Sequence, residues 1–233
     1  MNAYIDIYCE RTAPGLWAEP LNALTNLAFV ASALLLGRLL LAGEAGARRD
    51  PVAWMFVALV LVIGIGSSLF HTFARRWAML ADVIPIALFI LLYVWFAIRQ
   101  FAQGSAWASG GGVAAVLAVA MLVPPLTGFR GGSYVAALLA MLAIGGWLVR
   151  ARRHPAGPAL LGTAALFAVS LAFRTADAPA CHVFPAGMHF VWHILNAAVL
   201  FLVTRTMIRH GANRVGTGGL SALPSPASGS GNP

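Results

Sequence analysis

Charged residues are scarce in this chain, and their scarcity excludes an ordinary soluble protein. Only 9% of the 233 residues are charged, whereas 60% are hydrophobic and the mean hydropathy is +0.83. Soluble domains carry about 25% charged residues. Lysine is missing altogether, because all 15 basic residues are arginine. A nucleic-acid partner is not expected, since binding it would require a soluble basic surface with interleaved aromatic residues, which the sequence lacks.

The first 19 residues also lack a basic stretch followed by an apolar one. No cleavable signal peptide is therefore visible, and we expect the first hydrophobic segment to act as an uncleaved insertion signal.

Long hydrophobic runs are what the chain does contain. A hydrocarbon core about 30 Å thick requires roughly 20 apolar residues per helix. Seven stretches fit, at 20–42, 52–73, 78–99, 106–124, 132–149, 158–174 and 186–208. The sequence predicts an all-α, polytopic bundle of seven transmembrane helices over 20–210. An outer segment, 1–19, precedes the bundle, and a Gly-, Ser- and Pro-rich tail, 211–233, is expected to be a disordered cytoplasmic end.

The arginines are distributed unevenly between the two sides of the membrane. With seven spans, the side that holds the amino terminus carries five arginines and the opposite side carries ten. Because positive residues are enriched in cytoplasmic loops, we expect the amino terminus outside and the carboxyl terminus in the cytoplasm. The formal charge of +8 then reflects topology.

The two cysteines, Cys9 and Cys181, both fall on the outer side of this topology, one before the first span and one before the last. An oxidising exterior favours a disulfide between them. Two free thiols are the alternative.

Three histidines and one aspartate lie inside the apolar segments, where ionisable groups are costly and usually functional. His71 lies near the end of the second segment, and Asp82 lies near the start of the third. His189 and His193 lie near the start of the seventh. If the helices alternate in direction, these positions meet at one face of the membrane.

The spacing of the histidines favours a metal site. His189 and His193 are four residues apart and share one helical face, and with His71 they make up the three protein ligands of a catalytic zinc ion. A histidine pair of this kind can instead hydrogen-bond to neighbouring helices.

The two other candidate residues also have structural alternatives. Asp82 is the acidic residue at the same depth, and on its own it would suit an ion pair with Arg75 or Arg76. Ser67 shares the face of His71 one turn earlier, and on its own it is typical of helix packing. Three histidines and a carboxylate at one depth are hard to explain as packing, so we favour the metal.

These residues form motifs that resemble the alkaline ceramidase family, part of a superfamily of seven-helix membrane hydrolases that also includes the progestin and adiponectin receptors. The motifs are Gly66-Ser67-x-x-Phe70-His71, Asp82-x-x-Pro85, His189-x-x-Trp192-His193-Ile194-Leu195, Tyr8-Cys9-Glu10 and Glu19-x-x-Asn22-x-x-x-Asn26.

The resemblance implies a role for each matching residue. His71, His189 and His193 would bind Zn²⁺, Asp82 would act on the water at the metal, and Ser67 would help to stabilise the oxyanion. It also implies the disulfide between the two cysteines.

A calcium ion is a secondary expectation, because animal members of the family hold one in their amino-terminal loop. Glu10 and Glu19 match two of its ligand positions, and Asp6 lies one residue out of register. Ile7 and Thr12 replace an expected acid and an expected amide.

The expected activity is zinc-dependent hydrolysis of ceramide or a related N-acyl lipid, taken from the bilayer, to a fatty acid and a sphingoid-type amine. The alternatives are an ester hydrolase of glycerolipids and a receptor-like protein with structural zinc. A channel or transporter is disfavoured, because no inverted repeat of interrupted helices and no ring of charges is visible. We expect a monomer in a bacterial inner membrane, with its site toward the periplasmic leaflet.

Overall fold

The computed structural model describes residues 1–129 and 131–211, so most of the predicted tail lies outside the described residues. Within these ranges the regular secondary structure is helical, apart from one isolated β-bridge between Tyr4 and Arg75. The helices are α1 (Pro20–Thr25), α2 (Leu27–Ala42), α3 (Ala45–Arg48), α4 (Pro51–Phe73), α5 (Arg76–Gln100), α6 (Ala106–Thr127), α7 (Gly132–Trp147), η1 (Leu148–Arg152), α8 (Ala156–Ala180) and α9 (His189–His210).

Seven helical segments are long and apolar enough to cross a membrane, which confirms the predicted all-α, multi-pass architecture. α1 and α2 together make the first span, and α7 continues through the π-helical turn η1 to make the fifth. The remaining spans are α4, α5, α6, α8 and α9.

Several predicted boundaries differ from the structure, most of all around the loop before α9. α8 does not end at residue 174 but continues to Ala180, and α9 begins at His189 and not at residue 186. Arg174 and Asp177 interrupt the apolar run in the sequence, yet both are accommodated in the helix because partners from the amino-terminal segment and α9 meet their side chains.

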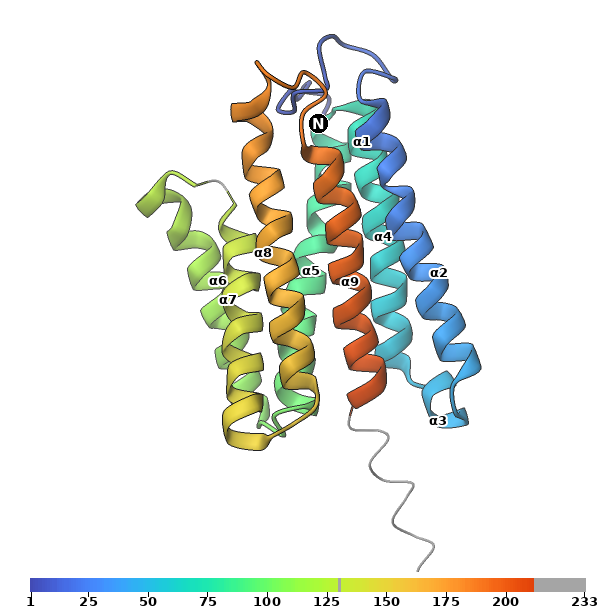
Figure 1. Ribbon diagram of the computed structural model, residues 1–233, viewed down its shortest axis with the longest axis vertical. Coiled ribbons are helices and arrows are strands. Elements are labelled where there is room, and N and C mark those ends of the chain that lie inside the picture. The colour runs from blue at the N-terminus through green and yellow to red at the C-terminus, as the bar shows by residue number, and fades with distance from the viewer. Residues whose placement is uncertain (130, 212–233) are drawn as a thin grey trace, which may run out of the picture.

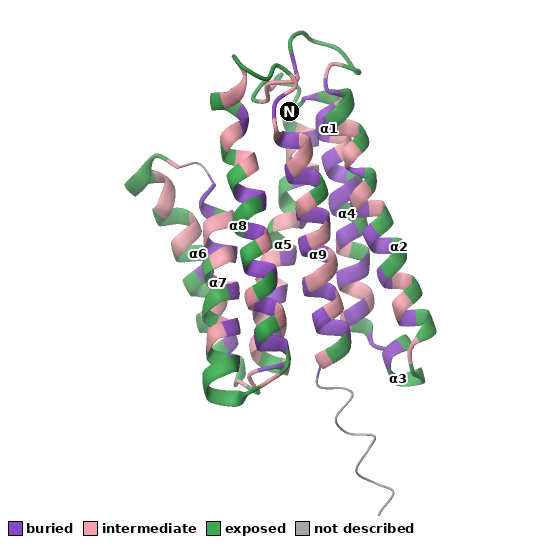
Figure 2. Cartoon of the chain, in the orientation of Figure 1, coloured by how far each residue is buried: buried purple, intermediate pink, exposed green. Residues whose placement is uncertain are grey.

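The spans pack in a closed ring. Each span contacts the next along the chain, and α9 returns to contact α2 and α4 (Figure 1). Buried residues face neighbouring helices, whereas exposed residues face outward (Figure 2). α6 lies at the edge of the bundle, where exposed Met121 and Leu126 suit contact with lipid tails.

The amino-terminal segment covers the end of the bundle where α4 stops and α5 begins. Ala74, in the left-handed region at φ 47°, ends α4 and allows a sharp connection to α5. The N–H of Ile5 donates to the carbonyl of Ala74 (2.9 Å), and the N–H of Arg76 donates to the carbonyl of Ala3 (3.1 Å). These bonds hold the segment at the same end of the molecule as the start of α9 (Figure 1).

One glycine sets the distance between α4 and α5. A Cβ added at Gly66 would lie 2.1 Å from the carbonyl oxygen of Ala81, which is far too close for two non-bonded atoms. The two helix backbones can approach this closely only because residue 66 is glycine. The contact brings Ser67 of α4 to the level of Asp82 of α5.

Candidate metal centre

The three predicted histidines meet at this end of the bundle. His71 lies in the last turn of α4, His189 is the first residue of α9, and His193 follows one turn later. Each is at most 2% exposed, and one ligand nitrogen from each lies within 4.8 Å of the other two. Within residues 1–129 and 131–211, they are the only group of three or more His, Cys, Asp or Glu side chains close enough to share one metal ion.

Two of the imidazoles are fixed by oxygen atoms behind them. Nδ1 of His71 lies 2.5 Å from Oε2 of Glu19, and Nδ1 of His193 lies 3.0 Å from Oγ1 of Thr25. Each contact uses Nδ1, so Nε2 of each ring takes no part in it. Metal-binding histidines usually donate their second ring N–H to an oxygen in this way.

The unpaired atoms of the cluster fit a metal ion. Nε2 of His71 and Nδ1 of His189 are buried and have no hydrogen-bond partner among the residues that the structure describes, which is rare in a folded protein. Tetrahedral zinc, with bonds of about 2.0–2.1 Å, separates its ligand atoms by about 3.4 Å. Small side-chain movements would thus bring the three nitrogens to one ion and leave a fourth position for another ligand.

Asp82 lies beside this cluster, on the far side of the Gly66 contact. It lines the same cavity as His189 and His193, and its Oδ1 is buried without a hydrogen-bond partner. In the described part of the chain it forms no ion pair with Arg75 or Arg76, so that alternative is not supported. Its carboxyl group interacts electrostatically with His71 and Arg174 and by a hydrogen bond with Ser67.

Ser67 is 4% exposed and lines the same cavity. Its place one turn before His71 on α4 puts its hydroxyl on the cavity side of the helix. The structure thus brings together all five residues that the sequence proposed for the zinc chemistry.

Glu19 has a role that the sequence analysis missed. Its carboxylate contacts Nδ1 of His71, accepts a hydrogen bond from Nε of Arg11, and accepts another from Nδ2 of Asn22 (3.0 Å). Burial alone would raise the pKa of Glu19, but hydrogen bonds with His71, Arg11 and Asn22 hold it below its usual value. The carboxylate is therefore a buried anion that orients a predicted metal ligand.

Arg11 occupies the space beside this carboxylate. In addition to Glu19, its guanidinium donates to the carbonyl oxygens of His71 (2.8 Å) and Gly15 (3.1 Å). The guanidinium of Arg11 thus neutralises the charge of the Glu19 carboxylate.

The residues expected for calcium are not brought together. Glu10 accepts hydrogen bonds from the N–H groups of Leu21 (2.6 Å) and Asn22 (2.8 Å) at the start of α1, and Asp6 is exposed. With Glu19 engaged by Arg11 and His71, the structure gives no support for a calcium site. Resemblance of single positions could not reveal this, because the pairing of Glu19 depends on His71, 52 residues away.

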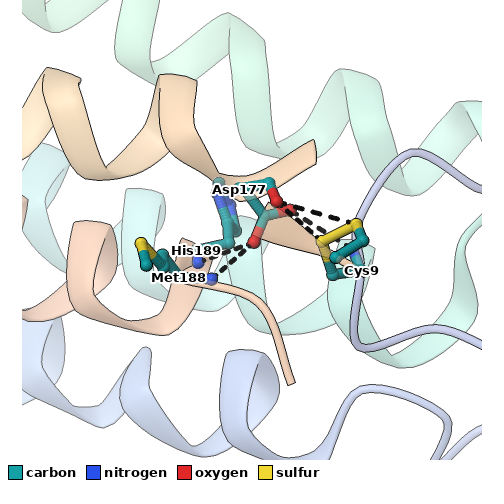
Figure 3. Close-up of a disulfide and its surroundings, with 5 residues drawn as sticks. Cys9, Asp177, Met188 and His189 are labelled. Atoms are coloured by element: carbon teal, nitrogen blue, oxygen red, sulfur yellow. Dashed lines mark hydrogen bonds between the residues drawn. A yellow bond between two sulfur atoms is a disulfide. The ribbon is translucent and has the colours of Figure 1, made fainter. Parts of the chain in front are cut away.

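The predicted disulfide between Cys9 and Cys181 is present. Beside it lies Asp177, whose buried carboxylate points at the start of α9 (Figure 3). It accepts hydrogen bonds from the N–H groups of Cys9 (3.2 Å), Met188 (2.7 Å) and His189 (3.0 Å). Because the first N–H groups of a helix lack partners within it, Asp177 fixes the point where α9 begins. The prediction that the sixth span ended at residue 174 concealed this role.

Tyr8 covers the cluster from the amino-terminal side. Its ring stacks on that of His189, with centroids 3.9 Å apart, and lies 5.0 Å from that of His71. Burial raises the pKa of the Tyr8 hydroxyl to about 12, against a smaller opposing effect of Arg174, so the group stays neutral. The adjacent disulfide at Cys9 anchors the segment that carries this ring.

The cluster opens on a cavity of about 120 Å³. An apolar cavity deeper in the bundle shares four of its lining residues: Ile63, Ile86, Tyr134 and Asn196. A more polar cavity at the end of the bundle shares three others: Ile7, Tyr8 and Arg174. The site is thus bordered by the apolar cavity within the bundle and by the cavity at its end, which has some polar lining.

Comparison with known protein families tests the resemblance that the sequence motifs indicated. No curated protein matched the chain. The sequence model of the family described as Ceramidase matches residues 3–217, which include the three histidines, Asp82, Ser67 and both cysteines. The chain therefore belongs to the ceramidase family.

Proposed function

We propose that this protein is a zinc-dependent amide hydrolase that cleaves ceramide or a related N-acyl lipid within the membrane. Water would add to the amide carbonyl and the C–N bond would break, releasing a fatty acid and a sphingoid-type amine. One observation carries the proposal: three buried imidazoles come together, two of them with an unpaired nitrogen, and His189 and His193 share a cavity with the unpaired Oδ1 of Asp82. Zinc is the proposed metal because three protein ligands and one open position are its usual catalytic arrangement.

A bound zinc ion would supply Lewis acidity, polarising the carbonyl and lowering the pKa of a water molecule to about 7. Asp82 would take the proton of the attacking water on Oδ1 and pass it to the leaving nitrogen. The Ser67 hydroxyl would donate a hydrogen bond to the carbonyl oxygen as negative charge develops there. Loss of one such donor typically costs about 3–4 kcal/mol in the transition state.

The apolar cavity supports a lipid substrate. It lies between the inner faces of α4, α5, α7, α8 and α9 and is lined by side chains such as Phe89, Met141 and Leu200. An acyl chain placed there would bring its amide carbonyl to the shared wall at Ile63 and Ile86, next to the histidines.

We also propose that the metal centre faces the outside of the cell, toward the periplasmic leaflet of a bacterial inner membrane. The arginine distribution supports this orientation. A green fluorescent protein fused after Pro233 should fluoresce, and alkaline phosphatase fused there should stay inactive. The reverse pattern would overturn the orientation.

The function is tested on protein purified in detergent. We expect about one zinc ion per chain and release of fatty acid from a fluorescent ceramide. His193→Ala should lose both zinc and activity, whereas His182→Ala, at an exposed histidine of the loop before α9, should keep both.

The same assay separates the alternatives. Cleavage of a matched glycerolipid ester without cleavage of the amide would favour the ester hydrolase. Stoichiometric zinc without hydrolysis of either lipid would favour the receptor-like protein.

A further inference from the structure

We infer that Arg174 binds an anionic group on the amine portion of the substrate. The preferred lipid would then carry a carboxylate close to its amide nitrogen, as an N-acyl amino acid does. This inference rests on the proposed amide hydrolysis and specifies its substrate class.

The guanidinium of Arg174 has more hydrogen-bonding capacity than the protein uses. A guanidinium has five N–H donors. In the described part of the chain, Arg174 makes one hydrogen bond, from Nη1 to the Tyr8 hydroxyl, at 3.4 Å. The rings of Tyr134 and Trp192 lie beside it, with centroids 4.8 Å and 5.4 Å from its Cζ. These rings orient the guanidinium plane but accept no conventional hydrogen bond.

Among the described residues Arg174 also lacks an anionic partner, although it lies within the membrane span α8. A charge in this setting normally pairs with an opposite charge. No carboxylate of the described residues lies within 4.0 Å of it, in contrast to Arg11, which pairs with Glu19. Asp82 attracts it across the cavity from beyond that distance, and the carboxylate oxygens of Asp177, one turn further along α8, accept backbone N–H groups.

The position of Arg174 indicates which part of a lipid would meet it. Its side chain lines both the cavity at the histidines and the cavity at the end of the bundle. The apolar cavity shares Ile63, Ile86, Tyr134 and Asn196 with the histidine cavity, but Arg174 does not line it. An N-acyl lipid with its acyl chain in the apolar space and its amide at the histidines extends its amine portion past Arg174.

The test compares N-palmitoylglycine with N-palmitoylglycinamide, which differ only in the charge beside the amide. We expect wild-type protein to cleave N-palmitoylglycine, which carries the carboxylate, with a kcat/KM about tenfold or more above that for N-palmitoylglycinamide. Hydrogen bonds to a charged group allow a difference of this size. Arg174→Met should remove this preference mainly through KM, and Arg174→Lys should restore part of it. Arg76→Met, at an exposed arginine away from the histidine cavity, is the matched control.

A binding measurement needs no turnover. The 4-oxo fatty acid in which CH₂ replaces the amide nitrogen of N-palmitoylglycine cannot be hydrolysed. We expect metal-free wild-type protein to bind it more tightly than its carboxamide, and Arg174→Met to bind the two equally.

Each outcome decides the proposal. Equal cleavage of the two substrates by wild-type protein would overturn it. An equal loss of kcat on the two substrates in Arg174→Met would also overturn it, because it would show that Arg174 acts through Asp82 and not on the substrate. If no amide is cleaved but the 4-oxo acid binds in an Arg174-dependent way, the proposed hydrolysis fails and the anion site stands. If Arg174→Met does not fold, the wild-type preference decides.

Discussion

At the scale of the residue, the candidate metal centre is defined as much by the atoms behind the histidines as by the histidines. His71 has a carboxylate at Nδ1, His193 has a hydroxyl, and His189 has an aromatic face at Tyr8. An imidazole held by a carboxylate is a stronger electron donor to a metal. The three ligands are therefore chemically unequal, and His71 should contribute most to affinity.

Replacing Glu19 tests this inequality. Glu19→Gln should weaken zinc binding by about 10- to 100-fold, because the neutral amide lacks the negative charge that the Glu19 carboxylate places beside Nδ1 of His71. Isothermal titration of metal-free protein with zinc would measure it, with exposed Glu44→Gln as the control. Because the change also removes the partner of Arg11, thermal unfolding without metal should be measured in parallel. An unchanged zinc dissociation constant would show that the contact is structural only.

Asp82 should act on protons and not on the metal. Asp82→Asn keeps the shape of the side chain but cannot accept a proton, so we expect kcat to fall by about 100- to 10,000-fold while zinc stays stoichiometric. Elemental analysis alongside the ceramide assay would check both parts. Exposed Asp6→Asn should behave as wild type. Wild-type turnover in Asp82→Asn would refute the acid/base role.

At the scale of the element, the contact between α4 and α5 sets the geometry of the proposed catalytic residues. Ser67 and His71 lie on one helix and Asp82 on the other, so their separation depends on how closely the two backbones approach. Gly66 is the residue that permits this approach.

Gly66→Ala should therefore damage both stability and activity. The added methyl group would force the helices apart or shift Ala81, and overpacking of this kind costs about 1–3 kcal/mol. Gly146→Ala in α7, where nothing lies within 4 Å of the added Cβ, is the matched control. Melting temperatures in detergent and kcat on ceramide would measure the effect. Equal values for the two variants would show that the contact is not limiting.

The elements themselves could largely be predicted from the sequence. Apolar runs of membrane length identified all seven spans, because lipid imposes a single length scale on a helix. The end of α8 could not be found this way, since Arg174 and Asp177 are polar residues stabilised by partners distant in sequence. The histidines and Asp82 were identifiable because ionisable groups are rare in apolar segments. Glu19, Arg11 and Tyr8 were not assigned their roles, because they belong to an irregular segment whose contacts follow no periodicity.

At the scale of the whole molecule, the amino-terminal segment and the loop before α9 form one covalently closed cover over the metal centre. The disulfide joins them across 172 residues of sequence, and Asp177 ties both to α8 and α9. In the chain-entropy account, closing a loop of this length stabilises by at most about 5 kcal/mol, because helices that persist in the membrane reduce the effect.

Removing the disulfide should loosen the cover. We expect Cys9→Ser/Cys181→Ser to unfold at a lower temperature and to lose activity, because Tyr8 and the start of α9 are no longer held over the histidines. Reductant should produce the same change in wild-type protein and no further change in the double variant. Identical melting temperature and turnover in the double variant and the oxidised protein would contradict this account.

The division of the ligands between α4 and α9 has a consequence for biosynthesis. Two of the three imidazoles belong to the last span that leaves the ribosome, so a nascent chain already threaded through six spans holds only one of them. The proposed activity would then appear only when α9 inserts against α2 and α4. A polypeptide terminated before α9 would stay in the membrane without activity.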